Sequence, residues 1–262
     1  MQKTSKTFAK FLAKVVGFCY NLATMKQIDF TQYFSYFRSR NDMLIFEGYC
    51  QNAQHVVVYK DGNNFLLLAN FGIRTDCCIV GDDHEFLQKC LPYFHGNVKF
   101  CGLTPTQLQF FRSRYKFLWQ TDCYLCVWDG KPMPVLPNSH QMGSLSIEHA
   151  QQVANGTPYL PPVEEVEECI VNRPSSALFV DGKPVCWCLL HLEKSLGMLY
   201  TLPEHRKKGY ALHVMVDLCN KVLQNGDVPF AYIVQSNVAS LALGKKYNLH
   251  SVGESYYFEI AF

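Results

Sequence analysis

The sequence predicts a mixed α/β protein built from one large or two small domains. Two observations support this class. Short runs of β-branched and aromatic residues alternate with segments of helical apolar spacing, and apolar residues make up 48% of the 262 residues. A third observation concerns the division of the chain. The segment Lys131-Pro-Met-Pro-Val-Leu-Pro137 interrupts every periodic pattern, so we interpret it as a linker between two folded parts.

Before the linker, the pattern predicts helices and strands in a definite order. Phe30, Phe34 and Phe37 share one helical face. Thr104 and Pro105 have the residue types of an N-cap and a first helical position. The sequence Asp-Gly-Asn-Asn at 61–64 predicts a hairpin turn. The expected helices are residues 30–37, 83–93 and 104–115, and the expected strands are residues 55–59, 65–69 and 122–128.

After the linker, turn and cap residues again mark the ends of the elements. Asp181-Gly182 predicts a hairpin turn, and Asn225-Gly226 predicts the end of a long amphipathic helix. Asn237 has the residue type of an N-cap for a helix that runs toward Tyr247. The expected helices are residues 146–154, 162–170, 211–222 and 237–247, and the expected strands are residues 177–180, 184–192, 196–202, 230–234 and the last residues of the chain.

Charge and composition exclude several classes of protein. The 24 basic and 22 acidic residues give a net charge of +2, which lacks the positive excess of a general nucleic-acid binder. No window holds the roughly 18 uncharged apolar residues of a membrane span. The 12 cysteines are scattered through apolar segments, as expected of small buried side chains in a reducing compartment. Cys123 and Cys126 fall on opposite faces of a strand, so no metal site is expected there.

The first 28 residues are basic and contain no acidic residue, since the first acid is Asp29. Their apolar residues fall close to helical spacing beside the lysines, which is the pattern of a mitochondrial import helix. A first helix docked on the domain, or a dispensable extension, fits the same pattern equally well.

The segment from Leu196 to Ala211 carries the chemistry. A strand runs into a loop that opens a long helix, and such a helix start binds a pyrophosphate through its unpaired N–H groups. Gly209 lets the backbone approach a phosphate closely, and small Ala211 packs the helix start near it. The residues expected to contact the phosphates are Arg206, Lys207, Lys208, Gly209, Tyr210 and Ala211. The pattern Arg206-x-x-Gly209-x-Ala211 resembles the loop by which the GNAT acyltransferase superfamily binds coenzyme A.

A longer run is more specific. Pro184-Val-Cys-Trp187, followed by Thr201-Leu-Pro-Glu-His-Arg206, resembles the glycine N-acyltransferase family, and the resemblance covers roughly residues 165 to 245. It implies a GNAT-type fold in the C-terminal half, preceded by a degenerate GNAT-like lobe. The implied division is an extension at 1–24, an N-terminal lobe at 25–137 and a catalytic domain at 138–262. The implied cosubstrate is acyl-CoA, with no metal.

The same resemblance indicates which residues meet the cosubstrate. Backbone groups at Leu199, Tyr200 and Thr201 are expected to line a slot for the pantetheine arm, and Asn237 is expected to contribute on the next helix. An N–H in the slot would polarise the thioester carbonyl.

The general base is harder to assign. The family's catalytic glutamate falls at Ser195 in an ungapped count, and serine is not a base of that kind. Glu193 and His191 lie two and four residues earlier, on the same face if the strand is regular. Either could replace the glutamate directly or through water, or both could lie on an exposed hairpin. The tyrosine that many GNAT enzymes use as an acid is replaced by Gly244.

We therefore expect an acyl-CoA-dependent N-acyltransferase that acts on glycine or another small amine. The alternatives are a GNAT acetyltransferase acting on a protein lysine or a polyamine, and a non-catalytic acyl-CoA-binding or interaction protein. We expect a monomer without a nucleic-acid partner, located in mitochondria or the cytoplasm, with mitochondria favoured by the basic first segment.

Overall fold

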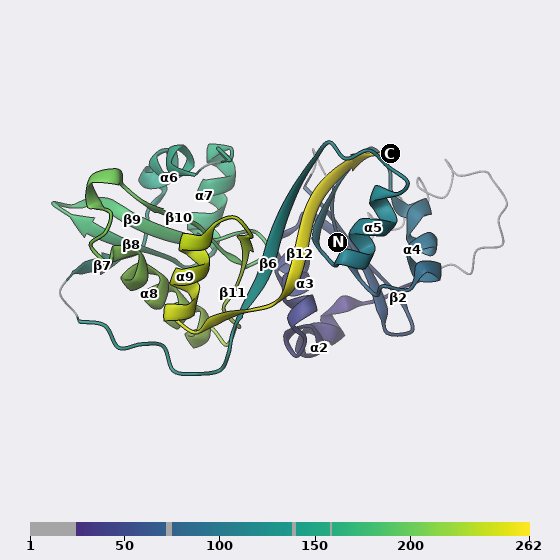
Figure 1. Ribbon diagram of the computed structural model, residues 1–262, viewed down its shortest axis with the longest axis horizontal. Helices are drawn as coiled ribbons and strands as arrows, with labels where there is room; N and C mark the ends of the chain where they lie inside the picture. Colours follow the sequence, from purple (N-terminus) through teal and green to yellow (C-terminus); the bar gives the residue numbers. More distant parts are fainter. Residues whose placement is uncertain (1–24, 72–74, 138–139, 158) are drawn as a thin grey trace.

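Two β-sheets organise the residues that the computed structural model describes, namely 25–71, 75–137, 140–157 and 159–262 (Figure 1). The suggested targeting segment, residues 1–24, lies outside the described residues. Within them, the larger sheet has eight strands in the order β1-β2-β3-β4-β5-β12-β6-β11. Its strands are β1 (Lys26–Gln27), β2 (His55–Asp61), β3 (Asn64–Asn70), β4 (Thr75–Val80), β5 (Asn97–Leu103), β6 (Trp119–Trp128), β11 (Phe230–Val234) and β12 (Leu249–Ala261).

The smaller sheet lies entirely in the part of the chain after the linker. In the described residues it has four antiparallel strands in the order β10-β9-β8-β7. They are β7 (Gln141–Gly143), β8 (Ser175–Val180), β9 (Lys183–Leu190) and β10 (Leu196–Thr201). β8 and β9 form the hairpin expected from Asp181-Gly182, where both residues adopt a positive φ.

Helices cover both faces of each sheet. They are α2 (Phe34–Arg38), α3 (Leu44–Asn52), α4 (His84–Cys90), α5 (Pro105–Arg112), α6 (Ala150–Gly156), α7 (Val163–Asn172), α8 (Tyr210–Gln224) and α9 (Val238–Lys246). Short 3₁₀ helices are η1 (Phe30–Tyr33), η2 (Asn41–Met43), η3 (Leu91–Tyr93), η4 (Ile147–His149) and η5 (Pro203–His205). Among these described helices, none is long and apolar enough to cross a membrane.

Apolar cores on the faces of the two sheets hold the layers together. α2 and α3 pack on one face of the large sheet through Phe37, Phe46 and Tyr49, and α4 and α5 pack on the other face. In the smaller sheet, α8 packs on one face, where Cys188 and Leu218 are fully buried. α6 and α7 pack on the opposite face around side chains from β9 and β10, namely Trp187, Leu189 and Met198.

The larger sheet joins the parts before and after the linker. β12, the last strand, pairs with β5 on one side and β6 on the other, and β6 also pairs with β11. In Figure 1, β6 and β12 run together through the middle of the molecule between the two groups of helices, and the C-terminus lies near α5. Two strands from residues 138–262, β11 and β12, therefore pair with strands from residues 25–137.

Most elements predicted from the sequence are present, and the differences have local causes. β11 has the predicted bounds, and Thr104 caps α5 with a capping box that includes Gln107. The helix expected at 83–93 ends as an α-helix at Cys90, because Pro92 turns the next residues into a 3₁₀ helix. The strand expected at 184–192 ends at Leu190, with consequences for the site described below.

Candidate active site

The loop after β10 opens α8 in the conformation expected of a phosphate-binding loop. Gly209 is the N-cap of α8, with φ of 81° and ψ of −3°, in the left-handed region. A Cβ atom built on Gly209 would find no neighbour within 4 Å, so the backbone conformation and not a lack of space favours glycine. The open space above this residue is where a ligand could approach the helix start.

The first turn of α8 is suited to an anion. It has no side-chain cap and no acidic residue, so the N–H groups of Tyr210 and Ala211 are not used by a capping side chain. The three cations Arg206, Lys207 and Lys208 precede it and are exposed. Unpaired N–H groups, a positive helix end and three cations together give a site for a pyrophosphate.

Side-chain contacts hold this loop against the end of β10. Arg206 donates from Nε to the carbonyl oxygen of Thr201 at 3.0 Å, and its guanidinium lies 5.4 Å from the centre of the Tyr200 ring. A guanidinium carries five N–H donors, so this bond does not exhaust its capacity for phosphate. His205 stacks on Tyr210 at 6.2 Å between ring centres.

β10 is bulged in its middle. Its pairing with β9 shifts between Gly197 and Tyr200, so Met198 and Leu199 together stand against the single residue Cys188, and Met198 has a φ of 52°. A bulge withdraws backbone groups from the ladder and increases the local twist. Main-chain groups of Leu199 are thereby released at the place where the sequence predicted a thioester-binding slot.

β10 and β11 separate where the two sheets meet. They are neighbours in space and are joined through α8, but β10 is an edge of the small sheet and β11 is an edge of the large one. In the described part of the chain the two strands share no pairing. The loop before α8 follows the C-terminal end of β10, and the slot for an extended ligand beside this strand stays a prediction.

Asn237 is the N-cap residue of α9. Its side-chain oxygen accepts a hydrogen bond from the Ser240 N–H at 3.0 Å, which caps α9 as the sequence predicted. Its contact with a cosubstrate remains a prediction. Gly244 is buried in the same helix, where a Cβ would lie 3.6 Å from the Leu249 carbonyl oxygen.

The three candidates for the base lie in a tight turn and not on one face of a strand. His191 N–H donates to the Ser195 carbonyl at 2.9 Å, and Lys194 N–H donates to the His191 carbonyl at 2.9 Å. Lys194 has a φ of 70°, which reverses the chain. The expectation of a shared strand face for His191, Glu193 and Ser195 was therefore wrong, because the hairpin turn replaces the last residues of the expected strand.

In this turn, the side chains of His191, Glu193 and Ser195 have different environments. Ser195 is only 1% exposed and donates from Oγ to Oε1 of Glu193 at 2.6 Å. The His191 ring lies over Gly197, since a Cβ at Gly197 would fall 1.8 Å from Nε2 of His191. His191 is thus packed on the strand, whereas Glu193 is oriented by a buried hydroxyl.

Glu193 lies at the junction of the elements that surround the splayed strands. Burial raises the pKa values of three tyrosines well above the ordinary range, and the nearby Glu193 carboxylate raises them further. These tyrosines come from α3, β11 and β12, and are Tyr49, Tyr232 and Tyr257. Residues 191–194 are half-buried and Ser195 is buried, so the turn is not the exposed hairpin that was one of the expectations.

Cys123 and Cys126, which share strand β6, are buried. Burial raises the pKa of Cys123 to about 12 and that of Cys126 to about 11, so both remain protonated thiols. Among the described residues, no group of three or more His, Cys, Asp or Glu side chains could hold a metal ion.

One element near the site was not found from the sequence. α3 lies against the turn that carries Glu193, and its contacts come from Glu47, Gly48 and Asn52. The available signal was a glycine inside a run of helix-forming residues, which often marks a close backbone approach.

Comparison with known proteins agrees with this geometry. Residues 181–258 match the family model described as FR47-like protein. A segment of 117 residues is 27% identical to glycine N-acyltransferase from Bos taurus, covering 43% of this chain and 40% of the bovine protein. The match thus spans well under half the length of that relative.

Solved structures share the fold over most of the chain. A Drosophila protein of a structural genomics programme superimposes with a TM-score of 0.72 at 14% identity, covering 90% of this chain and 98% of that one. A GCN5-related N-acetyltransferase from Kribbella flavida superimposes with a TM-score of 0.54 at 10% identity, covering 86% and 95%. The chain has the GNAT acetyltransferase fold, and the matched sequences support its place in the GNAT-type acyl-CoA N-acyltransferase superfamily.

Proposed function

We propose that this protein transfers an acyl group from acyl-CoA to the amine of glycine or another small amine. The observation that carries the proposal is the uncapped start of α8 with left-handed Gly209, placed directly after a bulged strand that splays from its neighbour. The partial match to bovine glycine N-acyltransferase supports a small amine as the acceptor.

The proposed arrangement lays the cosubstrate along β10 from its C-terminal end toward the bulge. The pyrophosphate would bind the N–H groups at the start of α8, beside Arg206, Lys207 and Lys208. β10 has six residues and therefore spans roughly 20 Å. The pantetheine arm would follow this strand toward the bulge, where the Leu199 backbone can contact the thioester.

The proposed chemistry assigns the proton transfer to Glu193. The amine nitrogen attacks the thioester carbon, a C–N bond forms, and the C–S bond breaks. Glu193, held by Ser195, would accept the amine proton directly or through a water molecule. Coenzyme A leaves as the thiolate and takes a proton from water, which its low pKa permits without a tyrosine at position 244.

The experiment is a turnover assay with purified protein, short and aromatic acyl-CoA donors, and a panel of amines. Free thiol and the N-acyl product are measured together. Product from glycine or another small amine, in one-to-one ratio with thiol, is expected. If product formed only with peptide lysines or polyamines, the acceptor would belong to that class and not to the small amines. Binding of acyl-CoA without turnover would overturn the proposal in favour of a non-catalytic acyl-CoA-binding protein.

A further inference from the structure

α3 of the N-terminal part contacts the backbone of the turn that carries Glu193. A Cβ atom built on Gly48 would lie 2.2 Å from both the carbonyl carbon and the carbonyl oxygen of Glu193. That distance is far inside van der Waals contact, so the two backbones approach as closely as they do only because residue 48 has no side chain. Gly48 lies in the middle of a helix, where glycine is otherwise a poor choice.

A hydrogen bond fixes the residue before Glu193. Asn52, at the end of α3, donates from Nδ2 to the Leu192 carbonyl at 2.7 Å and to the Gly48 carbonyl at 2.9 Å. The same amide therefore ties the turn to the helix position that the turn touches. These partners are 140 residues apart in the sequence.

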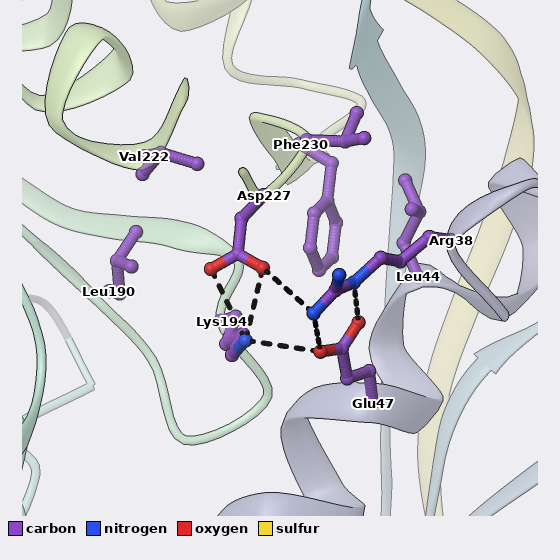
Figure 2. Close-up of a pocket in the computed structure, with 9 residues that line it drawn as sticks. Arg38, Leu44, Glu47, Leu190, Lys194, Val222, Asp227 and Phe230 are labelled. Atoms are coloured by element: carbon purple, nitrogen blue, oxygen red, sulfur yellow. Dashed lines mark hydrogen bonds and ion pairs between the residues drawn. The ribbon is translucent and has the colours of Figure 1, made fainter. Parts of the chain in front are cut away.

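Ion pairs fix the residue after Glu193. Figure 2 shows Lys194 between the carboxylates of Glu47 and Asp227, at 3.6 Å and 3.2 Å. Arg38 forms a two-bond pair with Glu47 and lies 3.9 Å from Asp227. The Glu47 side chain is 4% exposed. Burial alone would raise the pKa of Glu47, but the Arg38 hydrogen bonds and the charge of Lys194 outweigh it and lower the pKa.

We infer that α3 is a positioning element for Glu193, and this inference rests on the function proposed above. The close backbone approach, the hydrogen bond and the ion pair that α3 makes with this turn fall on three successive residues, Leu192, Glu193 and Lys194. Hairpin turns are ordinarily mobile, whereas a general base must be held within a fraction of an ångström of its productive position. The N-terminal part thereby acts on the reaction in the C-terminal part without contacting the substrate.

We expect Gly48→Ala and Asn52→Ala to lower kcat. In Gly48→Ala, the Glu193 backbone would have to move by about 1 Å to bring the added methyl group to an ordinary van der Waals distance. A displacement of that size can lower kcat by about 10²-fold. Asn52→Ala removes the hydrogen bonds to the Leu192 and Gly48 carbonyls and should lower kcat by about tenfold. In both variants the Kd for coenzyme A should remain within twofold of the wild-type value, because the phosphate loop is untouched.

Matched controls separate positioning from general damage. Gly253→Ala adds a methyl group where no atom lies within 4 Å. Asn172→Ala removes an amide that also donates to the carbonyl four residues earlier, on α7. Both controls should keep wild-type kcat. Thermal unfolding of every variant shows whether the fold is retained, and Asn52→Ala tests the inference if Gly48→Ala fails to fold.

The deciding experiment combines each α3 variant with Glu193→Gln. The losses are expected to vanish in the Glu193→Gln background, because a misplaced base costs nothing once the base is absent. Equal losses in both backgrounds, or wild-type kcat in both single variants, would overturn the inference while leaving the proposed function intact. A wild-type protein without turnover would overturn both.

Discussion

Replacement of Gly209 by aspartate and by asparagine isolates the charge requirement of the phosphate loop. The two side chains have nearly the same shape, and both tolerate the left-handed conformation that Gly209 adopts at φ of 81°. Neither meets a neighbour within 4 Å at its Cβ. Each variant should therefore lose only about 1 kcal/mol of folding free energy from the backbone conformation.

The two variants should differ strongly in their affinity for coenzyme A. A carboxylate about 4 Å from one phosphate charge costs about 1 kcal/mol in water and about 4 kcal/mol at the dielectric of a protein surface. Gly209 is exposed, so the lower half of that range applies, and Gly209→Asp should bind about 10- to 30-fold more weakly than Gly209→Asn.

Isothermal titration with coenzyme A at low and high salt measures this difference. The gap between the variants should narrow as salt rises, because ions screen an exposed charge. Equal affinities for the two variants at low salt would refute the assignment of residues 206–211 as the pyrophosphate site. Unfolding temperatures within a few degrees of each other would show that both variants are folded.

Three further changes test other parts of the structure. Glu47→Gln should lower the free energy of unfolding by roughly 1–3 kcal/mol at neutral pH. The pKa of Glu47 is lower in the folded state than in the unfolded state, so its contribution to stability is present above the unfolded-state pKa and is lost as pH falls through the folded-state pKa. The free energies of unfolding of wild type and Glu47→Gln, measured by denaturant titration, should therefore converge below about pH 4. Ser195→Glu would place a second carboxylate beside Glu193, at a position that is 1% exposed. It should therefore destabilise the protein by about 3–5 kcal/mol and not restore a base. An unchanged unfolding temperature would contradict this expectation. Deletion of residues 1–24 should leave the unfolding temperature unchanged, since the resemblance to glycine N-acyltransferases starts the N-terminal lobe at residue 25, whereas aggregation of the shortened protein would assign that segment to the core.

The sequence predicts the loop before α8 and the helix itself well because their signals are local. Gly209, the three preceding cations and the apolar spacing of α8 lie within one stretch of chain, and the helix ends at Asn225 as expected. The caps at Thr104 and Asn237 are likewise read from single residues with a known backbone preference.

The environment of Glu193 could not be predicted in the same way. The alternation rule assumes that a strand continues, and it fails where Lys194 adopts a left-handed conformation. That turn is held by Asn52 and Glu47, which are far away in the sequence and give no periodic signal. The pairing of β11 and β12 with strands from before the linker also cannot be predicted from local sequence, since any strand pattern permits it.

One comparison decides whether Glu193 is the general base: the pH dependence of kcat for wild type and Glu193→Gln, with glycine as the acceptor. Glutamine keeps the size of the side chain and can still accept the Ser195 hydrogen bond. The variant should be roughly 10²–10⁴-fold slower at neutral pH, and the deficit should shrink as pH rises and free amine becomes abundant. Equal rates for the two proteins at neutral pH would contradict this assignment and show that Glu193 takes no proton in the reaction.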